Sequence, residues 1–352
     1  MPNATTAQPL SDHGAAVTLP ARSKLDVRYE ITPTQRGKVV FEPAAIRVRS
    51  RLGLADLQLR IGVAQPVQVY PNFAALSRYA WLAGDRRLAE IGIKTYAARG
   101  AGTDFKQLGE YVPGMPTRHI DWNASFRHRR AVVREFQDDR DQSVMFLLDC
   151  GRRMRADDTQ HGIGATHFDQ CLNALMLLAF VALRHGDAVG AMTFGVADGA
   201  QTRFAPRKGQ QTLNALMAAL ADVETTATFS DYERIAAECL SQRRKRGLVV
   251  MITNSRNEDA PQLGAALALL RTRHIVILAN LREEVVALIT EQPLTNQESA
   301  LECAAALEYA QARDRLLQRL AKRGVRTIDC EPRRLGVELV NRYRALKRSG
   351  SI

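Results

Sequence analysis

Short apolar runs alternate with longer amphipathic segments through the second half of the chain, and this alternation constrains the fold more than any other feature. The clearest runs are residues 144–148 (VMFLL) and 248–252 (LVVMI). A run of this length without polar alternation is typical of a strand that is buried on both faces. Such strands separated by helices predict an α/β fold, a doubly wound and mostly parallel sheet with helices on both faces.

The same pattern gives the remaining elements of this domain, which we expect to span residues 143–348. Further strands are expected at residues 188–194, 275–278 and 325–328. Helices are expected at residues 167–184, 210–221, 231–243, 261–271, 299–322 and 333–347.

The first part of the chain has a different pattern. Residues 1–23 are rich in Ala, Thr, Ser and Pro, and they are predicted to be a disordered tail. Residues 24–71 hold short β-rich runs between Pro and Gly signals, and they predict a small N-terminal β-rich subdomain. Residues 72–142 are expected to form a helix at residues 73–98, followed by an irregular but ordered connector.

The strong positive charge of the chain narrows the classes of partner. A formal net charge of +12 and a sequence pI near 9.8 favour an anionic membrane surface or an acidic protein. Nucleic acid ranks lower, because no motif combines aromatic with basic residues. The densest basic run, Arg243–Arg246, is expected to be the basic end of a helix, where cations complement the helix dipole.

Cysteine usage and hydropathy bear on the compartment. The five cysteines are scattered without metal-ligand spacing, which is typical of free thiols in a reducing environment. The first twenty residues lack the apolar centre of a secretory signal. The longest nearly apolar run, residues 171–183, is shorter than the roughly 20 residues that span a bilayer. We therefore expect a cytoplasmic protein.

Polar residues follow two of the predicted strands and open a helix between them. Asp149 ends the first buried strand, Asn254 follows the second, and Ser230 precedes a helix. Because ligands of open α/β sheets bind beyond the carboxyl ends of the strands, these three loops are expected to converge. Their oxygen atoms are of the kind that holds a hard cation.

These loops carry a resemblance to known proteins. Asp149 and the turn after it resemble the Asp-x-Ser-x-Ser loop of von Willebrand factor A domains. In that family this loop, a Thr and an Asp of two further loops form a metal-ion-dependent adhesion site for Mg²⁺. More specifically, roughly residues 25–347 are similar to a bacterial family, domain of unknown function 58. The residues that carry this similarity are Tyr111, Pro113, Gly114, Arg118, Asp121, Trp122, Arg134 and Glu135.

The chain departs from the metal-site pattern that this resemblance implies. Gly151 and Arg153 stand where the two serines are expected, and Asn254 stands where the third loop has Asp. Ser230 keeps a hydroxyl in place of Thr, whereas Met115 occupies a position that the family usually fills with Asp. Because Mg²⁺ gains little from an amide in place of a carboxylate, we expect a degenerate site without a cofactor.

Two alternatives are open for Arg153. Its guanidinium could enter the pocket and pair with Asp149, so that a permanent cation replaces the metal ion. Alternatively, Arg153 points to solvent and Asp149 only caps the turn that follows it. Binding of Mg²⁺ at this position ranks third.

Two other groups of residues are interpreted as structural. The Trp122 indole is expected to anchor the connector on the sheet, with Asp121 bonded to a neighbouring Arg. A zinc site is not expected at the polar residues that lie close together in sequence, namely His161, His167, Asp169 and Cys171.

The family resemblance implies a non-enzymatic interaction or scaffold protein. Its partner would be a MoxR-type AAA+ ATPase, in protein maturation or envelope stress, bound by the loops around Asp149, Ser230 and Asn254. Family members usually carry N-terminal membrane helices, so the inner face of the cytoplasmic membrane is an alternative location. Two other functions stay open: a basic protein that binds a membrane surface or nucleic acid, and an uncharacterised hydrolase. No Walker A, Gly-x-Ser-x-Gly or His-Glu-x-x-His motif supports the hydrolase.

Overall fold

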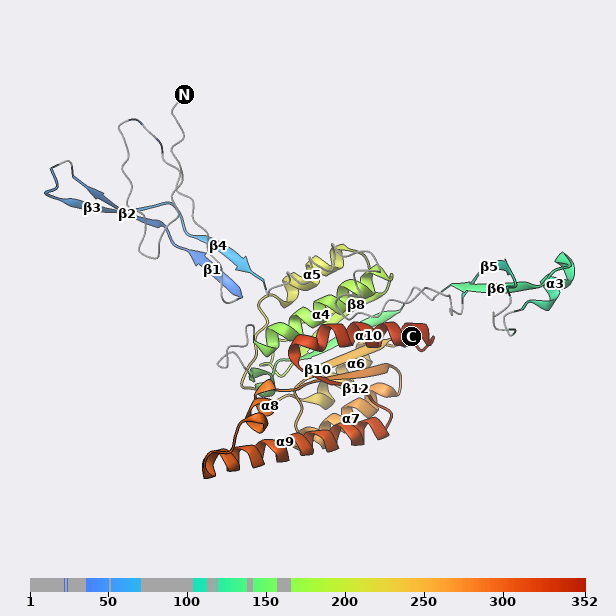
Figure 1. The fold of residues 1–352 in the computed structure, drawn as a ribbon. Coiled ribbons are helices and arrows are strands. Elements are labelled where there is room, and N and C mark those ends of the chain that lie inside the picture. Colours follow the sequence, from blue (N-terminus) through green and yellow to red (C-terminus); the bar gives the residue numbers. More distant parts are fainter. Residues whose placement is uncertain are drawn as a thin grey trace. The chain divides into compact units, whose positions relative to one another are not determined.

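The structure is a computed structural model, and it describes residues 22, 24, 36–50, 52–70, 104–112, 117, 120–137, 142–156 and 166–352 (Figure 1). The chain divides into two compact units, Met1–Val69 and Tyr70–Ile352. The predicted tail at residues 1–23, apart from Arg22, and the predicted helix at residues 73–98 lie outside the described residues.

The first unit consists of two antiparallel strand pairs. Its strands are β1 (Gly37–Phe41), β2 (Ala44–Arg49), β3 (Asp56–Ile61) and β4 (Gln65–Val69). Strand β1 pairs with β4, and β2 pairs with β3. The β2–β3 turn is held by the Ser50 hydroxyl, which accepts hydrogen bonds from the amides of Leu54 and Ala55, each at 3.1 Å. The predicted small β-rich region is therefore confirmed.

The connector before the α/β domain is a regular hairpin, which corrects the expectation of irregular structure. Its elements are β5 (Asp104–Glu110), α3 (Trp122–His128) and β6 (Val132–Gln137). Strands β5 and β6 are antiparallel, with a register shift between Phe105 and Gln107. Of the Pro and Gly residues that suggested irregular structure, Pro113, Gly114 and Pro116 fall in the long connection between the two strands, where α3 begins at its N-cap residue Asp121.

The second half of the chain forms the predicted α/β domain. Its elements, in chain order, are β7 (Ser143–Asp149), η2 (Arg152–Arg155), α4 (His167–Arg184), β8 (Ala188–Phe194), β9 (Arg203–Arg207), α5 (Gln211–Leu220), α6 (Tyr232–Gln242), β10 (Leu248–Thr253), η4 (Asn257–Asp259), α7 (Ala260–Arg271), β11 (Ile275–Leu281), α8 (Glu284–Glu291), α9 (Gln297–Lys322), β12 (Arg326–Cys330), η5 (Pro332–Arg334) and α10 (Leu335–Arg348). The strands form one six-stranded sheet in the order β12-β11-β10-β7-β8-β9. All neighbouring pairs are parallel except β8 and β9. The predicted fold class is confirmed.

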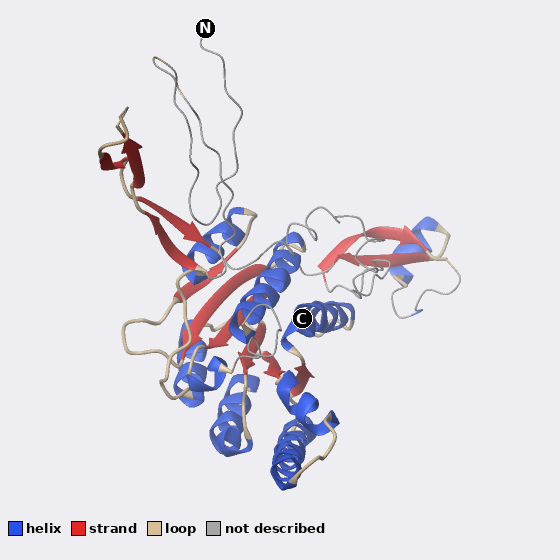
Figure 2. Ribbon diagram, turned by 60° about the vertical axis from the view of Figure 1, so that its left-hand side comes forward, coloured by secondary structure: helices blue, strands red, loops and turns tan. Residues whose placement is uncertain are grey.

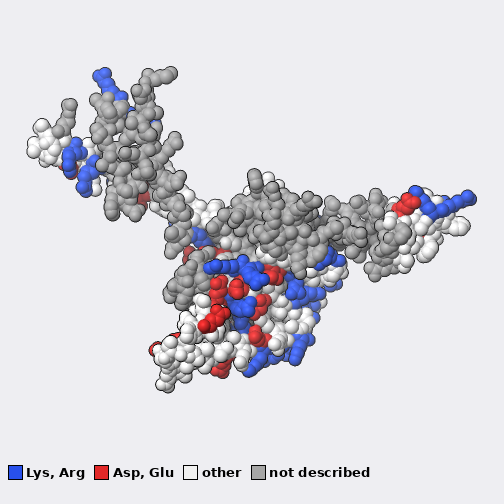
Figure 3. Space-filling view, viewed as in Figure 1, with Lys and Arg blue, Asp and Glu red and all other residues white. Residues whose placement is uncertain are grey.

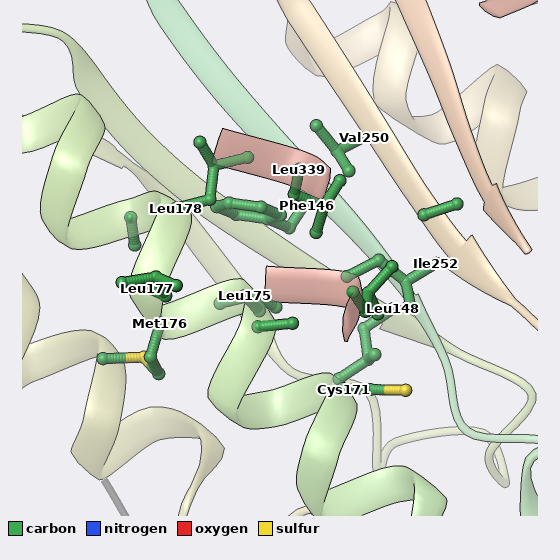
Figure 4. Close-up of a cluster of buried hydrophobic side chains, with 14 of the residues drawn as sticks. Phe146, Leu148, Cys171, Leu175, Met176, Leu177, Leu178, Val250, Ile252 and Leu339 are labelled. Atoms are coloured by element: carbon green, nitrogen blue, oxygen red, sulfur yellow. The ribbon is translucent and has the colours of Figure 1, made fainter. Parts of the chain in front are cut away.

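The sheet lies between two helical layers (Figure 2). Along β7, the side chains of Phe146 and Leu148 pack with α4, α5 and α10, while those of Met145 and Leu147 pack with α6, α7 and α9. Figure 4 shows Phe146 and Leu148 beside the residues of α4 and next to Leu339 of α10. All seven residues of β7 are buried, as an apolar run without polar alternation predicts.

The strand order determines where polar loops can meet. From β7 the chain moves to β8 and β9 on one side, and it then returns to β10 on the other side of β7. The strand order therefore reverses at the carboxyl ends of β7 and β10, which is the position where open α/β sheets bind ligands. We call the side of the sheet where the parallel strands end the carboxyl edge, and the opposite side the amino edge.

Two elements of the domain were not predicted. Strand β9 carries Pro206, and it pairs only with β8 at the margin of the sheet, which is the place where a strand tolerates proline. Helix α8 is only eight residues long and has no fully buried residue. Within the described residues, no helix combines the length and the hydropathy needed to cross a membrane.

Candidate functional site

Three loops converge at the carboxyl edge, as predicted. The Ser230 hydroxyl, from the loop before α6, lies 2.5 Å from the Asp149 carboxylate at the end of β7. The Asn254 amide, from the loop after β10, lies 3.3 Å from the backbone carbonyl of Arg153. Because parallel strands β7 and β10 are neighbours, their carboxyl ends bring residues about a hundred positions apart into contact.

The Asp149 carboxylate is completely buried and accepts hydrogen bonds on both oxygens. Its Oδ1 accepts from the Gly151 amide at 2.8 Å and from the Ser230 hydroxyl. Its Oδ2 accepts from the Thr253 hydroxyl at 2.6 Å and from the Tyr232 hydroxyl at 3.4 Å. Burial raises the pKa of Asp149 above its ordinary value, and the hydrogen bonds from Ser230, Thr253 and Gly151 oppose that rise.

Two glycines allow the loops to approach closely over this carboxylate. A Cβ atom on Gly151 would lie 2.1 Å from the Ser230 Oγ and 2.9 Å from the backbone carbonyl oxygen of Thr228. Gly195, at the end of β8, has a φ of +74°, and a Cβ there would lie 2.5 Å from the Gly151 nitrogen. The missing side chain at Gly151 is therefore a packing requirement, because the space of a serine is already filled.

Arg153 forms neither of the two arrangements considered from the sequence. Its guanidinium pairs with Glu258 and lies 3.5 Å from the Asp259 carboxylate, both in η4. Its side chain is only 14% exposed, so it does not point to solvent. The proposed Arg153–Asp149 pair is thus wrong: η4 supplies two carboxylates, whereas Asp149 is already satisfied by hydroxyl and amide donors. The expected capping role of Asp149 is correct, since it accepts from the Gly151 amide.

Asn254 links loops instead of serving as an open ligand. Its side-chain amide donates to the Arg153 carbonyl and, at 2.8 Å, to the Glu283 carboxylate before α8. Its oxygen accepts from Arg313 of α9 at 3.4 Å. Arg313 is itself buried, and it also donates to the Leu281 carbonyl and to the Asp329 carboxylate.

The residues present do not fit the Mg²⁺ ion that the von Willebrand factor A-like pattern implies. Mg²⁺ requires a near-octahedral shell of oxygens at about 2.1 Å. Both oxygens of Asp149 already accept protein donors, Gly151 cannot carry a hydroxyl, and the Asn254 oxygen faces the Arg313 guanidinium. Within the part of the chain that the structure describes, no group of three or more His, Cys, Asp or Glu side chains is placed to hold a metal.

The surface above these buried groups combines an aromatic side chain with charge. Phe229 is 48% exposed, and the Arg152 guanidinium lies 5.2 Å from the centre of its ring. Beside Phe229 is a hollow of about 200 Å³. The charged residues that line it are Asp198, Arg203, Asp231, Arg234 and Glu238. The accessible part of the site is therefore this rim, not the residues that the sequence singled out.

The residues of the longer family motif belong to the hairpin. The Tyr111 amide donates to the Ala131 carbonyl at 2.9 Å and extends the β5–β6 pairing. Asp121 is the N-cap of α3 and accepts from the Ala124 amide at 3.0 Å. Trp122 is 72% exposed at the first position of α3, so its expected packing on the sheet is wrong.

The other residues of the motif lie outside the described residues or have only their backbone described. Pro113, Gly114, Met115 and Arg118 lie outside the described residues. Arg134 and Glu135 lie in β6, and only their backbone is described. The expected pairing of Asp121 with an Arg side chain stays a prediction for this reason. His161 of the cluster that was set aside as a zinc site is also outside the described residues, and Cys171 is buried in the core.

Three residues of the buried network were not predicted from the sequence. Thr253 is the last residue of β10, and the sequence pattern pointed to the next residue, Asn254, as the polar residue at this strand end. Tyr232 follows the N-cap residue Asp231, and nothing in its position points to Asp149. Arg313 had a signal: it precedes Leu316, Leu317 and Leu320 on the buried stripe of α9, where a charged residue needs partners.

Comparisons with known proteins give a family and several distant structures. The sequence model of the family described as "Protein of unknown function DUF58" matches residues 107–327. A point mutant of the PilB minor pilin from Streptococcus sanguinis is 9% identical, with 90% of this chain and 88% of that chain covered and a TM-score of 0.38.

Two further solved structures are similar at the same level. A von Willebrand factor type A protein from Catenulispora acidiphila is 10% identical, with 57% of this chain and 42% of that chain covered and a TM-score of 0.33. The conserved hypothetical protein BatB from Bacteroides thetaiotaomicron is 9% identical, with 59% and 99% covered and a TM-score of 0.34. No curated protein sequence matches the chain significantly.

Proposed function

The chain belongs to the DUF58 family of proteins of unknown function, and from that premise we propose that it is a non-enzymatic interaction protein that binds its partner without a metal ion. The carrying observation is that the loops of a metal-type adhesion site converge around Asp149, yet protein donors occupy both of its carboxylate oxygens. Such a site has lost its ion while keeping the loop arrangement that presents a surface.

The rim of the carboxyl edge is the surface that we assign to partner binding. Aromatic and arginine side chains contribute most of the binding energy at many protein interfaces. Phe229 and Arg152 provide this combination, and the charged hollow beside Phe229 supplies polar groups that can fix the orientation of a partner. The loops beneath them are held by hydrogen bonds to Asp149, so the rim loses little conformational entropy on binding.

The family resemblance supplies the class of partner, a MoxR-type AAA+ ATPase, and with it a role in protein maturation or envelope stress. A cytoplasmic location is part of this proposal and agrees with the free thiols of all five cysteines. A hydrolase is the less favoured alternative, because the buried network around Asp149 consists of satisfied donors and acceptors with no group open to a substrate.

The test is affinity for a MoxR-type ATPase from the same source, measured by biolayer interferometry with the full chain immobilised. Phe229→Ala is expected to weaken binding by about thirtyfold, or about 2 kcal/mol, as is usual for a central interface residue. Arg152→Ala should weaken it less, since one of its contacts is the Phe229 ring. The matched control is Leu269→Ala, which truncates a comparably exposed apolar side chain of α7.

Two results would contradict the proposal. The first is wild-type affinity for Phe229→Ala and Arg152→Ala alike. The second is specific binding of Mg²⁺ or Mn²⁺ to the chain alone, seen by calorimetry and abolished in Asp149→Ala, because it would show that the site still holds an ion.

A further inference from the structure

Basic residues gather at the amino edge of the sheet, opposite the candidate site. Six segments form this edge, because they either precede a parallel strand, follow the antiparallel strand β9 or end α10: residues 183–189, 206–211, 242–247, 270–274, 321–326 and 345–352. Their basic residues are Arg184, Arg207, Lys208, Arg243, Arg244, Lys245, Arg246, Arg271, Arg273, Lys322, Arg323, Arg326, Lys347 and Arg348. Figure 3 shows Lys and Arg gathered on the side of the domain where α9 and α10 end.

Acidic residues are nearly absent from the same segments. Among these described residues the one acidic side chain is that of Asp187, which is fully buried. It accepts from the Tyr343 hydroxyl at 2.5 Å and pairs with Lys347 at 2.8 Å, so it offsets a single cation. The three acidic residues directly before β7 in sequence, Asp138, Asp139 and Asp141, lie outside the described residues, and they are fewer than the cations of the edge.

Three arginines of this edge donate hydrogen bonds to neutral acceptors. Arg243 donates to the Ser143 hydroxyl at 2.5 Å, Arg273 donates to the Leu240 carbonyl at 3.2 Å, and Arg271 donates to the Arg323 carbonyl. These acceptors are all neutral, so they orient the guanidinium groups without cancelling their charge. The pKa of His274 is lowered first by burial and then by the positive charges of Arg243 and Arg273 nearby.

The favourable interaction of cations with helix C-termini explains only some of the basic residues at this edge. One or two cations in the last turn suffice to complement a helix C-terminus. Helix α6 ends at Gln242 and is followed by four successive basic residues, 243–246, of which the last three are exposed. Arg207 is the last residue of β9 and complements no helix C-terminus. The excess charge is therefore available to an external anion.

We propose that the amino edge binds the surface of an anionic lipid bilayer. Clusters of four to eight basic residues are enough to hold a protein at such a surface, at about 1 kcal/mol for each cation near it. A bilayer fits better than nucleic acid, because these six segments hold none of the exposed large hydrophobic residues of the described chain, and therefore no exposed aromatic ring on which a base could stack. Of the described helices that reach this edge, only α5 begins there, so helix N-termini offer little to a nucleic-acid backbone phosphate.

The experiment is flotation of the full chain with vesicles of phosphatidylcholine alone or mixed with phosphatidylglycerol, at low and high salt. The test variant is Arg244→Gln/Lys245→Gln/Arg246→Gln, three exposed positions outside the core. The control Arg282→Gln/Arg333→Gln/Arg334→Gln removes the same charge from exposed residues of the carboxyl edge. Thermal melts of each variant verify that it is folded.

The expected results distinguish binding by the amino edge from binding by the net charge of the whole chain. The chain binds the anionic vesicles only, high salt releases it, and the test variant partitions roughly a hundredfold more weakly than the control. Equal loss in test and control variants, equal binding to neutral vesicles, or tighter binding to duplex DNA or single-stranded RNA than to vesicles would each overturn the inference. Since the ATPase test uses the opposite edge, failure of one proposal leaves the other standing.

Discussion

Replacing Gly151 by serine would restore one of the hydroxyls expected in a metal-ion-dependent adhesion site. The structure predicts a loss of stability instead of a gain of metal binding. The new Cβ would lie 2.1 Å from the Ser230 Oγ, so the Ser230 side chain must rotate away and release Asp149. It would also lie 2.9 Å from the Thr228 carbonyl oxygen, which is backbone and can only move with its loop.

The magnitude follows from these two effects. Overpacking a close backbone contact costs about 1–3 kcal/mol. Loss of a buried hydrogen bond to a charged group costs about 1.5–3 kcal/mol. Together they predict a decrease in the free energy of unfolding of about 3–5 kcal/mol, which lowers the Tm of a domain of this size by about 10 °C.

Differential scanning calorimetry with and without Mg²⁺ is the assay. Gly151→Ala should be destabilised to a similar degree, because the Cβ and not the hydroxyl causes the clash. Gly264→Ser is the control: it lies within α7, where the new Cβ meets only the end of the flexible Arg323 side chain, at 3.4 Å. Wild-type stability for Gly151→Ser, or a Mg²⁺-dependent rise in its Tm that Gly151→Ala lacks, would refute this account of the site.

Three further predictions concern buried ionisable groups. Because the folded state raises the pKa of Asp149, the contribution of this group to stability is fully present below about pH 4 and is lost as pH rises through the folded pKa. In urea titrations across this range, the free energy of unfolding of Asp149→Asn should therefore depend less on pH than that of the wild type. An equal pH dependence in the two proteins would contradict the assignment. Asp187→Ala leaves Lys347 without its buried partner and should lower the free energy of unfolding by about 3–5 kcal/mol in chemical denaturation; a change below about 1 kcal/mol, roughly that of a surface pair, would contradict it. Burial raises the pKa of Cys239 to about 11 and that of Cys330 to about 12, so iodoacetamide should modify both far more slowly in native protein than in urea, as mass spectrometry can measure; equal rates would show that these thiols are accessible.

The fold could be predicted because the strands that build its centre are buried on both faces. The run 144–148 is apolar at every position, and only a central strand of a covered sheet requires this. Strand β9 was missed because it is short, contains Pro206 and is fixed by its pairing with β8, a tertiary interaction that leaves no local pattern. Helix α8 was missed because it is only eight residues long, and an apolar stretch this short does not distinguish a helix from a strand.

The site could be located from the sequence but not its bonding. Two strand ends gave Asp149 and Asn254 and one helix start gave Ser230, since backbone topology alone brings such positions together. Backbone topology does not determine which partner a long side chain binds. Arg153 could reach several carboxylates, and the choice of Glu258 and Asp259 depends on how η4 folds after β10, about a hundred residues further along the chain.

The buried Arg313 connects several strand ends of the carboxyl edge with α9. Its guanidinium reaches the Leu281 carbonyl, the Ser255 carbonyl and the Asp329 carboxylate, which belong to the ends of three strands. Moving β12 away would remove the carboxylate that pairs with the buried guanidinium, and moving either of the other two strand ends would break a hydrogen bond of Arg313, so Arg313 couples all three strand ends to α9. Because Arg313 also donates to Asn254, which donates to the Arg153 carbonyl, we expect a displacement of α9 to shift the loop that follows β7 as well.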